Sequence, residues 1–173
     1  MSFHKKILIA VLVTALLLGF GLWGWWIHVA NKHVEAVNLV IQGNPTEEQL
    51  VSFLKSKDRI LLSNTLTVLE RRRVAGGKEM AANLLTHPDP YVWFGASLYL
   101  GSLGDQRSVP YLIRGLDHPA WRSRPRVVSY LRSLTGQDYD DRKEEWIKWW
   151  AEQHQGTLFN FASVTTGAMN EKN

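Results

Sequence analysis

Arginine is the residue type with the most evident chemistry in this sequence, because six arginines fall within a short stretch of its second half. A guanidinium group binds a carboxylate or a phosphate through two parallel hydrogen bonds. The arginines of this stretch, in which Asp117 is the only acid, are Arg107, Arg114, Arg122, Arg124, Arg126 and Arg132. Arg122 and Arg126 are four residues apart, so one helix would place them on the same face. We predict a partner-binding surface for an acidic protein segment or anionic lipid headgroups at Arg114, Trp121, Arg122, Arg124 and Arg126.

The alternative is that these arginines form a solvated helix face, which acids near the end of the chain partly neutralise. Those acids are Asp138, Asp140, Asp141, Glu144 and Glu145. The net charge of the whole chain is only +4, so nucleic acid is not expected as a partner.

Residues with catalytic or metal-binding spacing are not evident. The chain has no cysteine, which excludes a thiolate nucleophile and a cysteine-based metal site. His87 and His118 each precede a proline, and no H-x-x-x-H or HExxH motif occurs. Because they occupy equivalent positions of an internal repeat, we expect both to stabilise turns. We therefore expect that the chain is not an enzyme and that it binds no cofactor or metal.

The elements that position these residues are helices, because the sequence repeats with a period of about 31 residues and its apolar spacing is helical. Two sets of leucines mark the repeat: Leu54, Leu85 and Leu116, and Leu69, Leu100 and Leu131. A pair of short helices cannot bury its own apolar face, whereas stacked pairs share a core. No alternation typical of strands competes. The sequence therefore predicts an all-α fold, a short α-α solenoid of helix pairs.

Capping residues predict where the helices begin and end. Thr46 and Gln49 fit a capping box, Asp58 and Asp89 are N-caps, and Ser108 is a further N-cap. Helix ends are expected at Gly76-Gly77, Gly104-Asp105, His118-Pro119 and Thr135-Gly136. We expect one helix over 120–134 with a kink at Pro125, and a last helix over about 141–154.

Three tryptophans of that last helix, Trp146, Trp149 and Trp150, are spaced at helical steps and share a face. They could form an aromatic patch for a partner or close the core of the solenoid. We favour the second interpretation, because terminal repeats need special packing.

Two segments carry a resemblance to known proteins, HPDPYVWFGASLYLGSLGDQRSVPYLIRGLDHP and LTGQDYDDRKEEWIKWWAEQ. From Leu85 to Gln153 the chain resembles short bacterial HEAT-like repeats, including those similar to phycobilisome-lyase proteins. Its unit is shorter than the eukaryotic HEAT unit of about 40–47 residues. The resemblance implies helix pairs that serve mostly as protein-binding scaffolds. It also admits a lyase-type accessory protein that acts on a chromophore or a modified protein.

The beginning of the chain has the composition of a membrane-spanning helix. Residues 7–27 carry no charge, and a helix of this length reaches roughly 30 Å, the hydrocarbon thickness of a bilayer. Trp23, Trp25 and Trp26 lie at its far end, as in an aromatic belt. A cleaved signal peptide is the alternative, but its apolar core is usually only about 7–15 residues long. The basic residues before the stretch predict a cytoplasmic N-terminus.

We therefore expect a chain of five parts. These are a cytoplasmic stub (1–6), a transmembrane helix (7–27), a juxtamembrane helix and linker (28–44), a HEAT-like repeat domain (45–155) and a flexible tail (156–173). The expected function is that of a single-pass inner-membrane scaffold whose periplasmic repeat domain binds another protein, with the lyase-type accessory protein and an anionic-lipid sensor as alternatives.

Overall fold

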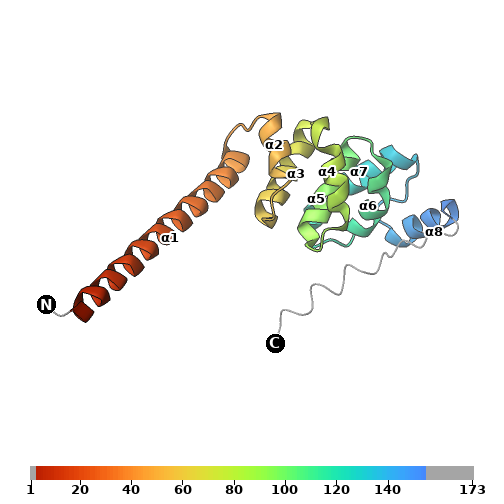
Figure 1. Cartoon of the computed structure of the whole chain (residues 1–173). Helices are drawn as coiled ribbons and strands as arrows, with labels where there is room; N and C mark the ends of the chain where they lie inside the picture. Colours follow the sequence, from red (N-terminus) through yellow and green to blue (C-terminus); the bar gives the residue numbers. More distant parts are fainter. Residues whose placement is uncertain (1–2, 155–173) are drawn as a thin grey trace. The chain divides into compact units, whose positions relative to one another are not determined.

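The computed structural model describes residues 3–154, with side chains for residues 22–154 other than His33 and Trp121. In these residues every regular element is an α-helix or a 3₁₀ turn (Figure 1). The chain divides into two compact units, Met1–Gly43 and Asn44–Asn173. The expected tail over 156–173 lies outside the described residues.

The first unit consists of the single helix α1 (Phe3–Gln42), which is 40 residues long. It continues without a break across the boundary between the expected transmembrane and juxtamembrane segments. Within the part of the chain whose side chains are described, no helix is both long enough and apolar enough for a membrane crossing.

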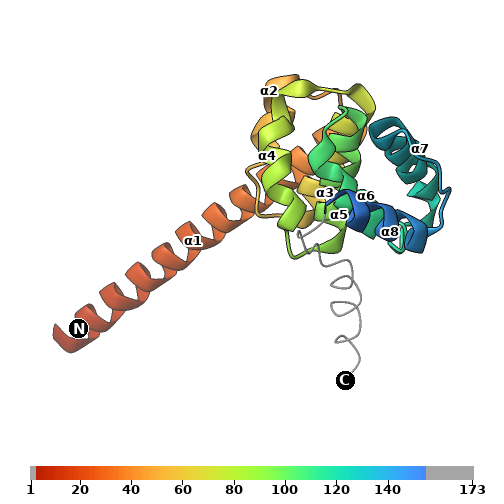
Figure 2. The same ribbon diagram turned by 90° about the vertical axis from the view of Figure 1, so that its right-hand side faces the viewer.

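The second unit is a stack of short helices arranged around a central one. Its α-helices are α2 (Glu47–Phe53), α3 (Arg59–Arg72), α4 (Lys78–Asn83), α5 (Pro90–Ser102), α6 (Val109–Gly115), α7 (Arg124–Thr135) and α8 (Lys143–Gln153). The 3₁₀ turns between them are η1 (Ala75–Gly77), η2 (Leu84–Thr86), η3 (Gln106–Ser108) and η4 (Trp121–Ser123). Helix α5 packs against α3, α4, α6 and α7, and α6 also packs against α7 and α8 (Figures 1 and 2).

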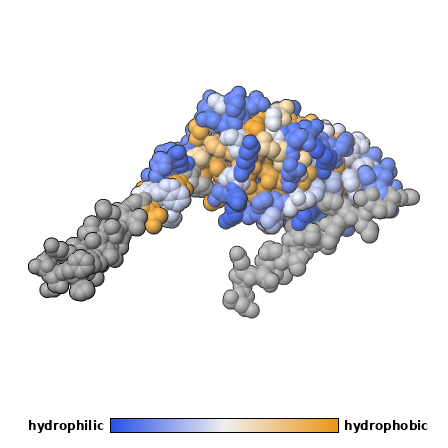
Figure 3. Space-filling view, viewed as in Figure 1, coloured by the Kyte–Doolittle hydropathy of each residue, from blue (hydrophilic) through white to orange (hydrophobic). Residues whose placement is uncertain are grey.

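The core of this unit confirms the predicted repeat. Leu54, Leu85 and Leu116, which occupy equivalent positions of successive repeats, are only 5%, 4% and 2% exposed. The second set of repeated leucines is fully buried: Leu69, Leu100 and Leu131. Polar side chains cover much of the visible surface of the unit, with apolar patches between them (Figure 3). The predicted all-α solenoid of stacked helix pairs is therefore confirmed.

Local capping explains where several helices begin. The capping box of α2 is present, because Gln49 N donates to Thr46 Oγ1 and Thr46 N donates to Gln49 Oε1 at 2.8 Å. Asp58 accepts from Leu61 N at 2.7 Å, and Asp89 accepts from Tyr91 N at 2.9 Å. Each carboxylate or hydroxyl satisfies an N–H group that the first helical turn leaves without a partner.

One expected helix end and one expected side-chain cap are wrong, although Ser108 does occupy the N-cap position of α6. Helix α3 ends at Arg72 and not at Gly76-Gly77, because the C-cap residue Arg73 has a left-handed φ of 52°. Gly77 serves close packing instead, because a Cβ there would lie 2.8 Å from Leu54 Cδ1. Ser108 does not cap α6 with its side chain; its hydroxyl donates to Asp105 O at 2.6 Å. Asp105 provides the cap, and it caps the preceding turn η3.

Two boundaries near the end also differ from the prediction. The helix expected from Ala120 begins only at Arg124, after the turn η4. Pro125 therefore lies in the first turn of α7, where no N–H donor is needed, and does not act inside a helix. The last helix begins at Lys143, two residues later than expected, after a turn in which Asp140 has a left-handed φ of 52°. The acids before it consequently belong to a loop.

Candidate functional site

A hollow between α7 and the loop before α8 brings three of the six arginines together. It encloses about 500 Å³, a volume in the range of ligand sites, which is about 300–1,000 Å³. We call it the arginine hollow, and its lining residues are Arg122, Arg124, Pro125, Val128, Arg132, Asp140 and Asp141. The hollow thus combines a short apolar floor with groups of both charges.

The acids of the loop pair with Arg124 and Arg132 at the surface. Arg124 Nη1 lies 3.6 Å from Asp141 Oδ2, and Arg132 lies 2.7 Å from Asp138 Oδ1 and 3.4 Å from Asp140 Oδ1. The hydrogen bond from Arg132 holds the pKa of Asp138 below its ordinary value. All of these side chains are between 42% and 72% exposed. Exposed ion pairs contribute about 0–1 kcal/mol, so a partner's carboxylates can replace the loop acids.

Arg126 lies outside the arginine hollow and holds a buried acid. Its Nη1 donates to both carboxylate oxygens of Glu70, at 3.0 and 2.9 Å, and its Nη2 donates to Ser123 Oγ. Tyr130 Oη also donates to Glu70, at 2.9 Å, and the Glu70 side chain is 4% exposed. Burial, together with the charge of Glu70, raises the pKa of Tyr130 to about 12. This cluster joins α3 to α7 across 56 residues of sequence.

The expectation that Arg122 and Arg126 share one helix face is therefore wrong. Arg122 belongs to the turn η4 and lines the arginine hollow, whereas Arg126 belongs to α7 and contacts Glu70. A 3₁₀ turn rotates successive residues by a different angle from an α-helix, so a four-residue spacing no longer places them side by side.

A second hollow of about 220 Å³ runs beside this cluster, and the sequence did not indicate it. Helix α3 contributes polar side chains to it and α5 contributes apolar ones. Its lining includes Ser63, Asn64, Glu70, Tyr91, Phe94 and Arg126. The sequence feature that could have indicated a buried acid beside this hollow is the position of Glu70, four residues after Leu66 on the apolar stripe of α3.

The remaining predicted residues are engaged elsewhere or lie outside the description. The guanidinium carbon of Arg114 lies 4.2 Å from the centre of a Trp93 ring, over its face. The side chain of Trp121 is outside the described residues. Arg107 bonds to Asp105 and to Glu79 of α4, and its side-chain bond to Asp105 is the main cause that lowers the pKa of Asp105 to about 2. Of the five predicted residues, the arginine hollow thus collects Arg122 and Arg124.

Both histidines before proline stabilise turns, as predicted. Asp89 N donates to His87 Nδ1, and Ala120 N donates to His118 Nδ1, each at 3.1 Å. His118 is 2% exposed and stacks on Phe94 with ring centres 4.1 Å apart. Burial lowers the pKa of His118, because the charged imidazolium loses its hydration there.

The buried imidazole of His118 predicts a loss of stability in mild acid. Its folded pKa is below the unfolded value of about 6.5, so the unfolded chain binds the proton more readily. The contribution of the neutral ring is complete above about pH 6.5 and declines as the pH falls from there toward the folded pKa. Urea unfolding at several pH values measures this slope. His118→Gln should flatten it, whereas His87→Gln, at the equivalent position, should not; equal slopes in wild type and His118→Gln would contradict the assignment.

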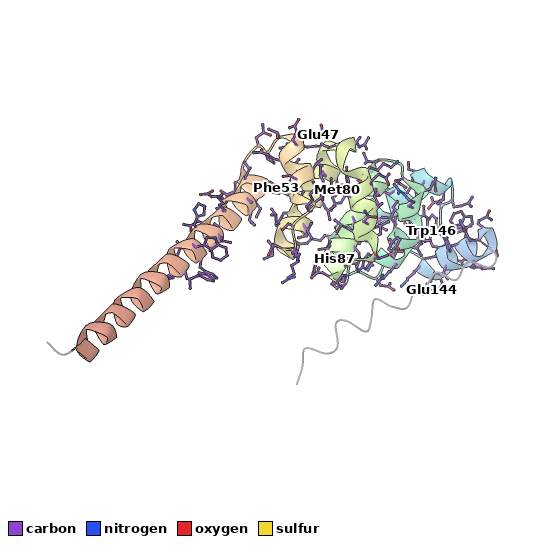
Figure 4. All side chains as sticks on the ribbon, in the orientation of Figure 1. Glu47, Phe53, Met80, His87, Glu144 and Trp146 are labelled. Carbon is purple, nitrogen blue, oxygen red and sulfur yellow. The ribbon has the colours of Figure 1, made fainter. Side chains whose placement is uncertain are left out.

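The tryptophans of α8 close the core, which confirms the favoured interpretation. Trp146 is fully buried, and its Nε1 donates to Asp140 O at 2.9 Å (Figure 4). Trp149 and Trp150 are half-buried and pack against the same core cluster. Trp150 also stacks on His154 with ring centres 3.7 Å apart.

Comparison with known proteins defines the class of this domain. Residues 47–132 match the family model of HEAT repeats. This match and the stacked helix pairs support a HEAT-like repeat protein, and HEAT repeats generally mediate protein–protein interactions. No curated protein and no solved structure matches the chain. The resemblance to phycobilisome-lyase repeats stays a prediction, since the match is to HEAT repeats in general.

Proposed function

We propose that the chain is a membrane-tethered scaffold whose repeat domain binds an acidic segment of another protein in the arginine hollow. One observation carries this proposal: Arg124 and Arg132 line an open hollow, and the carboxylates with which they pair are exposed. Arg124 also donates from its Nε to Leu116 O at 3.1 Å, which holds its guanidinium group at the hollow. Two guanidinium forks at one site suit an extended peptide with several acids. Arg107 and Arg126, by contrast, pair with the buried acids Asp105 and Glu70 and serve the fold.

Binding rather than catalysis fits the lining of the hollow. It is made of arginines, aspartates, a proline and a valine, and it contains no nucleophile placed next to a base. The loop acids act as exchangeable counterions for the arginines. Their displacement gives a partner selectivity for carboxylates and makes binding sensitive to salt.

The full chain in detergent, titrated with a fluorescently labelled polyglutamate peptide, tests the site. The variant with Arg122→Glu and Arg124→Glu should weaken binding roughly tenfold or more, equivalent to about 1.4 kcal/mol. The matched control replaces two exposed lysines away from the hollow, Lys55→Glu and Lys57→Glu, and should bind as wild type does. An equal loss in both variants would show only a net-charge effect and reject the site. Stronger binding to anionic vesicles than to the peptide would favour the lipid-sensing alternative.

The tether is proposed from the uncharged stretch over 7–27, which forms part of the uninterrupted helix α1. A helix anchored there by its basic N-terminal side would place the repeat domain in the periplasm and hold it near envelope proteins, where a high local concentration compensates for weak binding. The full chain should then stay in the membrane pellet after alkaline carbonate extraction. Its repeat domain should be cut by protease added to spheroplasts. Release of the full chain by carbonate would reject the tether without affecting the peptide result.

A further inference from the structure

The second half of α1 carries apolar residues with the spacing of a coiled coil. They recur alternately every four and three residues, at Trp23, Ile27, Ala30, Val34, Val37 and Ile41. An average of about 3.5 residues keeps such a stripe on the side of a helix that faces a supercoiled partner. The same spacing continues upstream in the sequence at Ile9, Val13, Leu16 and Phe20. We call the stripe from Trp23 to Ile41 the α1 seam.

Much of the α1 seam is exposed within a single chain. Trp23 is 60% exposed, Ile27 41%, Val34 54% and Ile41 56%, while Ala30 and Val37 are half-buried. Helices gain most of their stability from burying an apolar face against a neighbour. The exposed aromatic and β-branched side chains along the α1 seam therefore indicate an interaction surface.

We infer that the α1 seam pairs with the α1 seam of a second copy of this chain in a parallel two-stranded coiled coil. Ile27, Val34 and Ile41 occupy the a positions of the heptad, where β-branched residues favour two parallel strands. In a parallel homodimer each a residue meets its own counterpart, so the geometry requires side chains that tolerate self-pairing.

The charges of this segment are arranged as a homodimer requires. With the histidines His28 and His33 taken as neutral, the charged residues between Leu22 and Gln42 are Lys32 and Glu35. In this register they occupy the f and b positions, on the side away from the seam. Asn31 and Asn38, at the e positions, are neutral. No pair of like charges would therefore face each other across the interface.

Pairing through α1 goes beyond the proposed function and does not rest on the arginine hollow. Two copies held side by side would present two hollows to one partner, and the second binding event would become intramolecular. A membrane tether would enforce the parallel orientation; the seam itself argues for the pairing.

Because the chain contains no cysteine, single-cysteine variants test this pairing directly in the full-length protein. Disulfides require Cα atoms closer than about 7 Å, which matched a positions satisfy and f or b positions do not. Ile27→Cys, Val34→Cys and Ile41→Cys should give a dimer on mild oxidation, with a yield at least about fivefold above Lys32→Cys and Glu35→Cys. Similar yields at all five positions would overturn the proposal.

The pattern of yields also separates the rival arrangements. In an antiparallel pair each a residue would face a d residue of the other copy, so failure of all three a-position variants to form a disulfide overturns the parallel arrangement. A cross-linked product whose mass is not that of two copies overturns the choice of partner. Energy transfer between labelled full-length chains gives a second measure: Val34→Glu should abolish it, and Lys32→Glu should preserve it. Loss of peptide binding with intact energy transfer would reject only the proposed function.

Discussion

Leu100→Asp is expected to unfold the repeat domain. Leu100 lies in the central helix α5, is fully buried, and occupies the same repeat position as Leu69 and Leu131. A carboxylate there would lose its hydration and gain no cation, which costs more than about 4 kcal/mol, a large part of the stability of a small domain. Limited proteolysis and near-ultraviolet circular dichroism of the tryptophans should both report the loss.

Tyr91→Asp provides the matched control, because it places the same charge on the same helix. Tyr91 is 48% exposed and lies in the first turn of α5, where a negative charge is favoured by the helix dipole. Its effect should stay within about 1 kcal/mol. If Leu100→Asp retained a cooperative transition at the wild-type denaturant concentration, α5 could not be the centre of the core.

Arg126→Ala is expected to cost about 2–4 kcal/mol, because it leaves the charge of Glu70 buried with Tyr130 as its remaining partner. The Glu70 side chain is 4% exposed, but the Arg126 side chain is 46% exposed. Water can therefore reach part of the site, and the expected cost lies somewhat below that of a fully enclosed pair. Urea unfolding of the full chain measures the change in the free energy of unfolding.

Arg132→Ala separates this buried pair from an exposed one. Arg132 is 45% exposed and pairs with Asp138 and Asp140, which are 63% and 72% exposed, so its removal should cost no more than about 1 kcal/mol. Adding Glu70→Gln to Arg126→Ala should recover part of the loss, since the buried group is then neutral. If Arg126→Ala and Arg132→Ala lowered the free energy of unfolding equally, the loss in Arg126→Ala would not come from leaving the buried carboxylate of Glu70 without its arginine.

The repeat and its core were predictable from local pattern. The internal repeat and the helical spacing of apolar residues identify Leu69, Leu100 and Leu131 as core, and all three are buried. The N-caps at Thr46, Asp58 and Asp89 were also predictable. A cap depends on hydrogen bonds between residues two or three positions apart, and such bonds need no knowledge of the rest of the fold.

Helix boundaries set by packing were not predictable in the same way. Gly77 resembles a helix terminator, yet it allows Leu54 to approach the backbone closely. In the sequence Pro125 predicts a kink inside a helix, yet α7 begins only at Arg124, so the proline lies in its first turn. In both cases a residue with two possible roles takes the one that its neighbours in space permit.

The candidate site shows most clearly the difference between what the sequence predicts and what the packing decides. Amino-acid sequence alone was enough to identify a cluster of arginines, a stack of helix pairs and a tryptophan-rich closing helix, because composition and periodicity are properties of the linear chain. Only the tertiary structure decided which arginines pair with buried acids and which pair with exposed ones. Arg126 pairs with a buried acid 56 residues away, whereas the carboxylates that pair with Arg124 and Arg132 are exposed ones of a nearby loop. The strength of an ion pair depends on distance and burial, and both arise only when distant segments pack together.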